Sequence, residues 1–159
     1  MLLGEKSQCK FCGLNGSQIA YRRKPAESVL QDLRYVSSTL GHLSRRVMFV
    51  DNILDMSYFK TLLPAMEAET LHLSLFCETK ANLTREHVQG LRRAGFDVIQ
   101  PGVESLSSHV LALMKKGVSA LQNIRLLKYT QLKQTLLQFG TLFMGLWGKR
   151  KETMLNKCS

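Results

Sequence analysis

The feature that most constrains the fold is a regular alternation of helix patterns and short strand patterns that begins at residue 25. The segment 25–40 predicts the first helix, because its apolar residues recur at helical spacing and Pro25 suits an opening turn. Further helices are predicted over 56–69, 84–95, 105–117 and 119–132, and strands over 45–52, 71–83 and 96–102. This alternation is typical of an α/β fold in which helices join parallel strands.

Polar side chains follow the predicted strands at the points where the strands end. Because the carboxyl ends of parallel strands meet at one edge of a sheet, we expect these side chains to converge on one mouth, where carboxylates and amides can hold the amine and hydroxyl groups of a ligand. The alternative for any single residue is a helix cap or a solvated loop position. The residues are Asp51, Asn52, Glu78, Lys80, Gln100, Glu104 and Ser105.

The number of strand–helix units limits the architecture. Only about four β/α units fit before residue 131, which is too few for the eight of a complete barrel. An incomplete barrel and an open doubly wound sheet both agree with the pattern, and both place ligands at the carboxyl edge of the strands.

Cys9 and Cys12 form a C-x-x-C motif, whose spacing lets two thiolates reach one metal ion or cluster. The chain holds 4 cysteines at irregular spacing. A pair of reduced loop thiols is one alternative. Zinc fits poorly, because Cys77 lies in a predicted strand and Cys158 near the end of the chain. A thioredoxin-like pair fits poorly too, because a Gly-rich turn follows the motif instead of a helix.

Charge and hydropathy argue against a nucleic-acid partner, a membrane span and secretion. The net charge is +10, but the basic residues are scattered among apolar faces instead of forming one stripe, so no nucleic-acid partner is expected. No apolar run approaches the roughly 20 residues of a membrane span. The first residues lack the pattern of a secretory signal, so no membrane association and a cytoplasmic location are expected.

Four segments together resemble one known family. They are CKFCGLNG, FVDNILDMSYFKTLLP, ETKANLTREHVQGLRRAGFDVIQPGVESLSSHVLALMKKG and QNIRLLKYTQ. The chain resembles radical SAM enzymes over residues 4 to 130, in particular the cobalamin-associated subgroup that matures ribosomally made peptides (RiPPs).

The resemblance implies an incomplete parallel (β/α) partial TIM barrel over residues 1–130, a 4Fe-4S cluster and S-adenosylmethionine. The cluster cleaves S-adenosylmethionine to a radical that abstracts hydrogen, and relatives with cobalamin commonly methylate unactivated carbon in a peptide substrate. The implied contacts are cluster ligands at Cys9 and Cys12, the adenine at Phe11, the methionine amine at Asp51 and Asn52, and the ribose at Glu104 and Ser105.

The chain departs from this family at both ends. Met1 stands where the family has its first cluster cysteine, so cluster assembly is expected to be weak. After residue 131 the family pattern stops, and codons compatible with residues 136–159 spell a Trp-Asn family strand in another reading frame. We therefore expect a truncated or frameshifted piece of an enzyme, impaired in its chemistry, with an aberrant tail over 131–159 and poor solubility alone.

Two other functions are compatible with the sequence. The first is a non-catalytic half-barrel that uses Cys9 and Cys12 to bind a metal or a partner. The second is a small thiol-based metal or redox protein.

Overall fold

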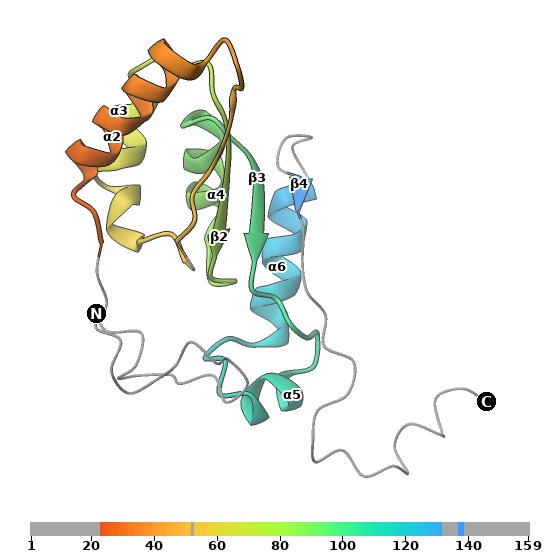
Figure 1. Cartoon of the computed structure of the whole chain (residues 1–159). Helices are drawn as coiled ribbons and strands as arrows, with labels where there is room; N and C mark the ends of the chain where they lie inside the picture. Colours follow the sequence, from red (N-terminus) through yellow and green to blue (C-terminus); the bar gives the residue numbers. More distant parts are fainter. Residues whose placement is uncertain (1–22, 52, 132–136, 139–159) are drawn as a thin grey trace.

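A computed structural model describes residues 23–51, 53–131 and 137–138 (Figure 1). Strands and helices alternate along the chain, which confirms the α/β prediction. The elements are α2 (Ala26–Tyr35), the π-helix η1 (Val36–Leu40), β1 (Arg46–Met48), the 3-10 helix η2 (Met56–Phe59), α3 (Leu62–Glu67), β2 (Ser74–Thr79), α4 (Arg85–Arg93), β3 (Phe96–Pro101), α5 (Ser108–Leu113), α6 (Ala120–Gln131) and β4 (Leu137–Gln138).

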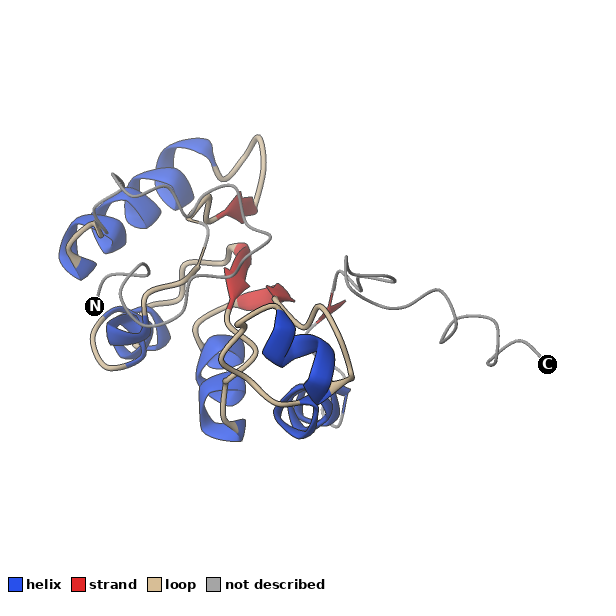
Figure 2. Ribbon diagram, turned by 90° about the horizontal axis from the view of Figure 1, so that it is seen from below, coloured by secondary structure: helices blue, strands red, loops and turns tan. Residues whose placement is uncertain are grey.

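In the described part of the chain the sheet is open and has four strands in the order β1-β2-β3-β4, with every neighbouring pair parallel. Helical segments join each strand to the next, and Figure 2 shows the strands following a curve with the helices along its outer side. The register shifts between Leu75 and Phe76, whose partners are Phe96 and Val98, so Asp97 is an extra residue in β3. This arrangement agrees with a partial (β/α) barrel.

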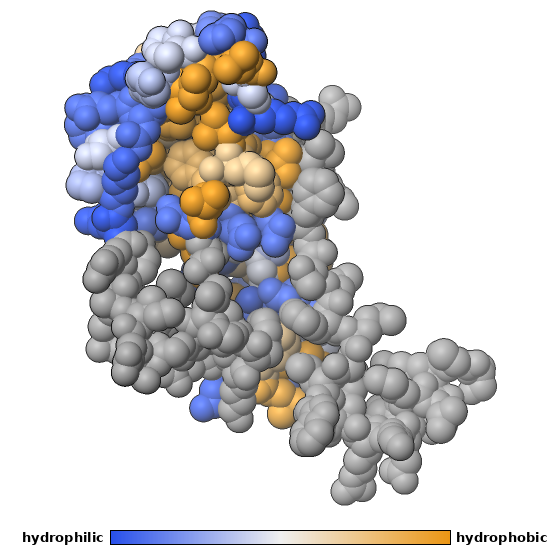
Figure 3. Space-filling model, viewed as in Figure 1, coloured by the Kyte–Doolittle hydropathy of each residue, from blue (hydrophilic) through white to orange (hydrophobic). Residues whose placement is uncertain are grey.

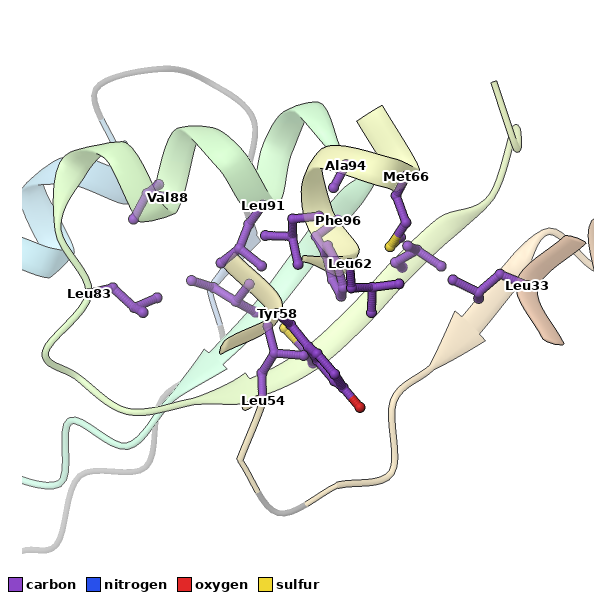
Figure 4. Packing of buried hydrophobic residues seen from close by; sticks show 14 of the residues in the cluster. Leu33, Leu54, Tyr58, Leu62, Met66, Leu83, Val88, Leu91, Ala94 and Phe96 are labelled. Atoms are coloured by element: carbon purple, nitrogen blue, oxygen red, sulfur yellow. The ribbon is translucent and has the colours of Figure 1, made fainter. Parts of the chain in front are cut away.

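The hydrophobic core lies between the sheet and the helices (Figure 4). The strands contribute alternate residues such as Leu75 and Phe96, and the helices contribute Leu62, Met66 and Leu91. Each of these side chains is at most 2% exposed. Burying one of them stabilises the fold by about 2 kcal/mol, so this layer of contacts holds the helices on the sheet.

The other face of the sheet is open and apolar. Met48, Phe76 and Val98 are register partners in neighbouring strands and so form one row across that face. Met48 is 65% exposed, and Val50, which follows β1, is 92% exposed. Figure 3 shows apolar residues gathered over the strands on this side. In a closed barrel this face would line the interior.

Several element boundaries differ from the sequence-based predictions, each for a local reason. The first helix, predicted over 25–40, is regular only as far as Tyr35, and a π-helix over Val36–Leu40 follows it. The strand predicted from residue 71 begins only at Ser74, because His72 has a left-handed backbone with φ 50°. Of the helix predicted over 105–117, only Ser108–Leu113 is helical, as α5. Lys115, shortly after its end, has a left-handed backbone with φ 52°. Left-handed residues cannot continue a strand or a right-handed helix.

No helix among the described residues is both long enough and apolar enough to cross a bilayer.

Candidate functional site

The carboxyl ends of β2 and β3 form the floor of the predicted mouth. Glu78 and Gln100 are register partners, and both are half-buried. Alternation along the strands places them on the open face, opposite Cys77 and Ile99, which are buried in the core. The structure therefore brings these two predicted site residues together.

Backbone hydrogen bonds hold the neighbouring loops at the same edge. The amide of Leu54, after β1, donates to the carbonyl of Glu78 at 2.8 Å. The amide of Gly102, after β3, donates to the carbonyl of Thr79 at 3.0 Å. The loops that follow β1 and β3 are thus both fixed to the end of β2.

Directly after β3 the chain makes a tight turn over residues 102–105, called the mouth turn below. The amide of Ser105 donates to the carbonyl of Val103 at 2.6 Å, and Glu104 between them has φ 59°. This is a three-residue turn around a left-handed residue. Glu104 is only 9% exposed and Ser105 only 8%. The two predicted ribose residues are therefore adjacent and buried at the mouth.

One oxygen of the Glu104 carboxylate has a hydrogen-bond partner, and the other has none among the described residues. Its Oε1 accepts a hydrogen bond from Lys116 Nζ at 3.1 Å, and the two side chains are 11% and 17% exposed. Its Oε2 is buried and has no hydrogen-bond partner among the described residues. A buried carboxylate oxygen without a donor is unfavourable, so this atom fits a ligand that supplies one.

Asn123, from α6, clamps the backbone of the mouth turn. Its Nδ2 donates to the carbonyls of Val103 and Ser105, both at 2.7 Å, and the residue is fully buried. Its Oδ1, like Thr79 Oγ1 at the end of β2, has no partner among the described residues. The described residues thus hold three buried side-chain polar atoms without a hydrogen-bond partner. Each belongs either to a residue of the mouth turn or to a residue hydrogen-bonded to that turn.

The other predicted binding residues lie at the rim or outside the described residues. Asp51 and Lys80 are exposed, and Asn52 lies outside the described residues. Burial, followed by the charges of Asp51 and Asp55, raises the pKa of Tyr58. Asp51 therefore lies close enough to Tyr58, in the segment between β1 and α3, to influence that side chain electrostatically.

The predicted cluster ligands Cys9 and Cys12, and the predicted adenine contact Phe11, also lie outside the described residues. Cys77 is not suited as a further cluster ligand, because burial, helped by the charge of Glu78, raises the pKa of its thiol to about 12. A protonated thiol in the core is a poor metal ligand. Within the described part of the chain, no group of three or more His, Cys, Asp or Glu residues is arranged around a metal position.

A separate cavity of about 550 Å3 lies among η2, α3 and α4, on the helix side of the sheet. The rings of Phe59 and His87, both lining residues, are 4.4 Å apart between centroids. None of the predicted site residues lines this cavity. We therefore place the candidate site at the mouth, where the buried polar atoms are.

Sequence reasoning did not find Gly102, Lys116 or Asn123. Asn123 carried a usable signal, since it lies at helical spacing with Leu126 and Thr130, which are buried on the same side of α6. Lys116 carried none, because nothing in its local sequence distinguishes it from exposed Lys115.

Parallel strands, outer helices and a polar carboxyl edge define a parallel β/α protein, a class whose members bind their ligands where the strands end. Residues 6–137 match the family described as "Radical SAM superfamily", and the chain belongs to this family. Membership implies a 4Fe-4S cluster and S-adenosylmethionine as cofactors of the family. The predicted division of the chain at residue 130 stays a prediction.

Solved structures with the same fold include two S-adenosylmethionine radical enzymes, one of them cobalamin-dependent. The S-adenosylmethionine methyltransferase TsrM from Kitasatospora setae, solved with tryptophan and a SAM analogue, has a TM-score of 0.76 at 19% identity over 94% of this chain and 30% of its own. OxsB, a cobalamin-dependent enzyme solved with aqua-cobalamin and S-adenosylmethionine, has a TM-score of 0.67 at 20% identity over 89% of this chain and 23% of its own.

These similarities show the fold. The chain spans less than a third of the length of either neighbour. No curated protein sequence matches it.

Proposed function

We propose that the mouth binds S-adenosylmethionine and that the chain contributes this half of the site in a radical SAM enzyme. The observation that carries the proposal is the buried Oε2 of Glu104, which has no donor among the described residues. A ribose hydroxyl of S-adenosylmethionine is a donor of the required kind, and a hydrogen bond to an ionised carboxylate is among the stronger ones in proteins.

The remaining predicted residues take the roles that the family resemblance implies. Cys9 and Cys12 would hold the cluster, and Phe11 would contact the adenine. Asp51 and Asn52 would hold the methionine amine. When bound, the cluster and S-adenosylmethionine supply a radical able to remove hydrogen from unactivated carbon. Glu78, Gln100 and Lys80 would complete the polar lining of the mouth.

The finer assignment is modification of a ribosomally made peptide, with cobalamin-dependent methylation as the reaction class. Support comes from the four sequence segments that resemble this subgroup and from the similarity to the cobalamin-dependent enzyme OxsB. The peptide and cobalamin belong to this proposal and await a direct binding measurement.

Two cluster thiols instead of three would impair the chemistry. After anaerobic reconstitution with iron and sulfide, we expect less bound iron than a complete cluster and little 5′-deoxyadenosine from S-adenosylmethionine. Cys9→Ala and Cys12→Ala should each lower the bound iron further, whereas Cys158→Ala should not. Iron that is unchanged in both motif variants would contradict the assignment of the C-x-x-C motif.

Binding of S-adenosylmethionine is tested separately from turnover. Calorimetric titration of the full chain should show binding that Glu104→Gln weakens about ten-fold or more, because a charge-assisted hydrogen bond is lost. Glu27→Gln, an exposed residue of α2, is the matched control and should bind as the wild type does. Equal affinities in all three proteins would refute the site.

A second candidate is a non-catalytic binding module, favoured by the burial and raised pKa of Cys77, which keep this thiol protonated and unsuited as a further cluster ligand. This candidate predicts binding at the mouth without any cleavage of S-adenosylmethionine. Detectable 5′-deoxyadenosine would exclude it. Iron that survives substitution of Cys9 or Cys12 would exclude a thiol-based metal protein as well.

A further inference from the structure

The mouth turn is held by side chains that come from outside it. Lys116 lies after α5, and Asn123 lies in α6. Lys116 bonds one oxygen of the Glu104 carboxylate, and Asn123 bonds the backbone carbonyls on both sides of Glu104. Lys116 therefore fixes the side chain of Glu104, and Asn123 independently fixes the backbone that flanks it.

The ion pair fixes which carboxylate oxygen faces a ligand. Both side chains are less than one-fifth exposed, so their attraction is screened less than that of a surface pair. With Oε1 bound to Lys116 Nζ at 3.1 Å, the carboxylate cannot rotate freely, and Oε2 remains available as the acceptor. Without Lys116, either oxygen could turn toward the ligand or toward the protein.

The ion pair needs the glycine at position 102. A Cβ added to Gly102 would lie 2.8 Å from Lys116 Nζ and 3.3 Å from Glu104 Oε1. Contacts under 3.0 Å do not occur for real Cβ atoms, so the lysine would have to move away. Because only the flexible end of that side chain must shift, the fold should tolerate the change while the ion pair does not.

We propose that Lys116 and Asn123 are positioning residues that orient Glu104 toward a sugar hydroxyl of the bound nucleoside. This inference rests on the proposed function, because it assigns a nucleoside to the mouth. It adds that recognition of the sugar depends on residues that do not touch it. Gly102 supplies the space in which the lysine reaches the carboxylate.

The test compares two probes that differ only in their sugar hydroxyls, adenosine and 2′,3′-dideoxyadenosine, by calorimetric titration of the full chain. The wild type should bind adenosine more tightly. Lys116→Met should lower the affinity for adenosine about five- to ten-fold, the effect of losing one oriented hydrogen bond, and leave the affinity for dideoxyadenosine unchanged. Lys116→Arg keeps the positive charge and should therefore retain part of the preference for adenosine over dideoxyadenosine.

Two further variants separate positioning from a general loss of structure. Lys115→Met, at the exposed neighbouring position, should bind both probes as the wild type does. Gly102→Ala should behave as Lys116→Met does, with a melting temperature close to that of the wild type. In the free protein, Asn123→Ala should speed hydrogen exchange of the amides at 102–107, and Lys115→Met should not.

The outcomes distinguish failure of the inference from failure of the function. If Lys116→Met lowers the affinities for both probes equally, or changes neither, the positioning role is wrong while nucleoside binding stands. If the wild type binds adenosine no better than dideoxyadenosine, Glu104 does not read the sugar, and the inference is overturned. A wild-type chain that binds neither probe overturns the proposed function itself.

Discussion

Asn123 uses both hydrogens of its side-chain amide on backbone carbonyls of a turn about 20 residues earlier in the chain. In this position it connects α6 to the loop after β3 through hydrogen bonds. Polar residues with this role stabilise one particular loop conformation, because an alternative conformation would leave buried carbonyls unpaired.

Asn123→Ala should therefore lower the free energy of unfolding by about 2–4 kcal/mol, since two buried hydrogen bonds are lost and two carbonyls lose their donor. Urea denaturation measures this change. Arg125→Ala, at an exposed position of the same helix, is the control and should change stability by no more than about 0.5 kcal/mol. Similar values for the two variants would show that the clamp is not a stabilising contact.

Cys77 predicts a pH dependence of stability in the alkaline range. Burial, with a smaller contribution from Glu78, raises the pKa of its thiol from the ordinary value of 9.0 to about 12 in the folded chain. Below pH 9.0 the thiol is protonated in both states, so its contribution is constant. Between pH 9.0 and about 12 the unfolded chain loses the proton first, and stability should fall.

Urea unfolding at a series of pH values across this window checks the prediction. Cys77→Ala is less stable at every pH because it leaves a cavity, but its stability should fall less steeply with pH than that of the wild type. Parallel curves for the two proteins would mean that Cys77 does not contribute to the alkaline loss.

At the scale of elements, α4 shows how local sequence signals specify a helix in this fold. Thr84 accepts a hydrogen bond from the amide of His87, and the His87 ring accepts one from the amide of Thr84. Gly95, with φ 92°, follows the helix and permits the turn into β3. Cap and stop signals therefore agree with the apolar stripe of Val88 and Leu91 that packs on the sheet.

Thr84→Ala should lower the free energy of unfolding by about 1 kcal/mol, because the first turn of α4 loses its cap. Thermal denaturation followed by circular dichroism would measure it. Thr70→Ala, at an exposed position between α3 and β2, serves as the control for removing a threonine hydroxyl. A larger loss at position 70 than at position 84 would contradict the role of the capping pair.

The elements show which parts of the fold could be predicted from the sequence. The alternation of strands and helices was predictable from residue periodicity, and the cap at Thr84 and the stop at Gly95 were predictable because each depends on neighbouring residues. The left-handed residues His72 and Lys115 were not, because a positive φ is uncommon for any residue other than glycine, so neither residue type by itself signals that conformation.

The candidate site was predictable only in part. The polar ends of β2 and β3 follow from parallel topology, so Glu78, Gln100 and Glu104 could be named. The pair between Glu104 and Lys116 could not, because it joins residues 12 positions apart across a turn and a short helix.

For the whole molecule, the open face of the sheet has the largest consequences for behaviour in solution. The edge strand β1 pairs with β2 on one side, and the row of Met48, Phe76 and Val98 faces away from the helices. Within the described ranges no further strand pairs with β1, and an edge strand with apolar neighbours favours association with other chains. The poor solubility expected from the sequence remains a prediction, to which the open face lends a physical basis.

Val50→Lys should reduce self-association, because it places a charge beside the edge strand where Val50 is 92% exposed. Sedimentation velocity at several protein concentrations measures the effect. Leu121→Lys adds the same charge on α6, where Leu121 is 55% exposed, and should leave association nearly unchanged. An equal reduction in both variants would indicate that net charge, not the sheet edge, governs association.

The backbone of Glu104 has one more consequence, for any attempt to engineer this chain. A φ of 59° is the conformation that glycine and asparagine adopt most easily, and a glutamate there is held at the expense of folding stability. A screen for thermostable variants would therefore favour Gly or Asn at position 104. Such variants would lose the carboxylate of the mouth, so the screen would trade ligand recognition for thermostability at this residue.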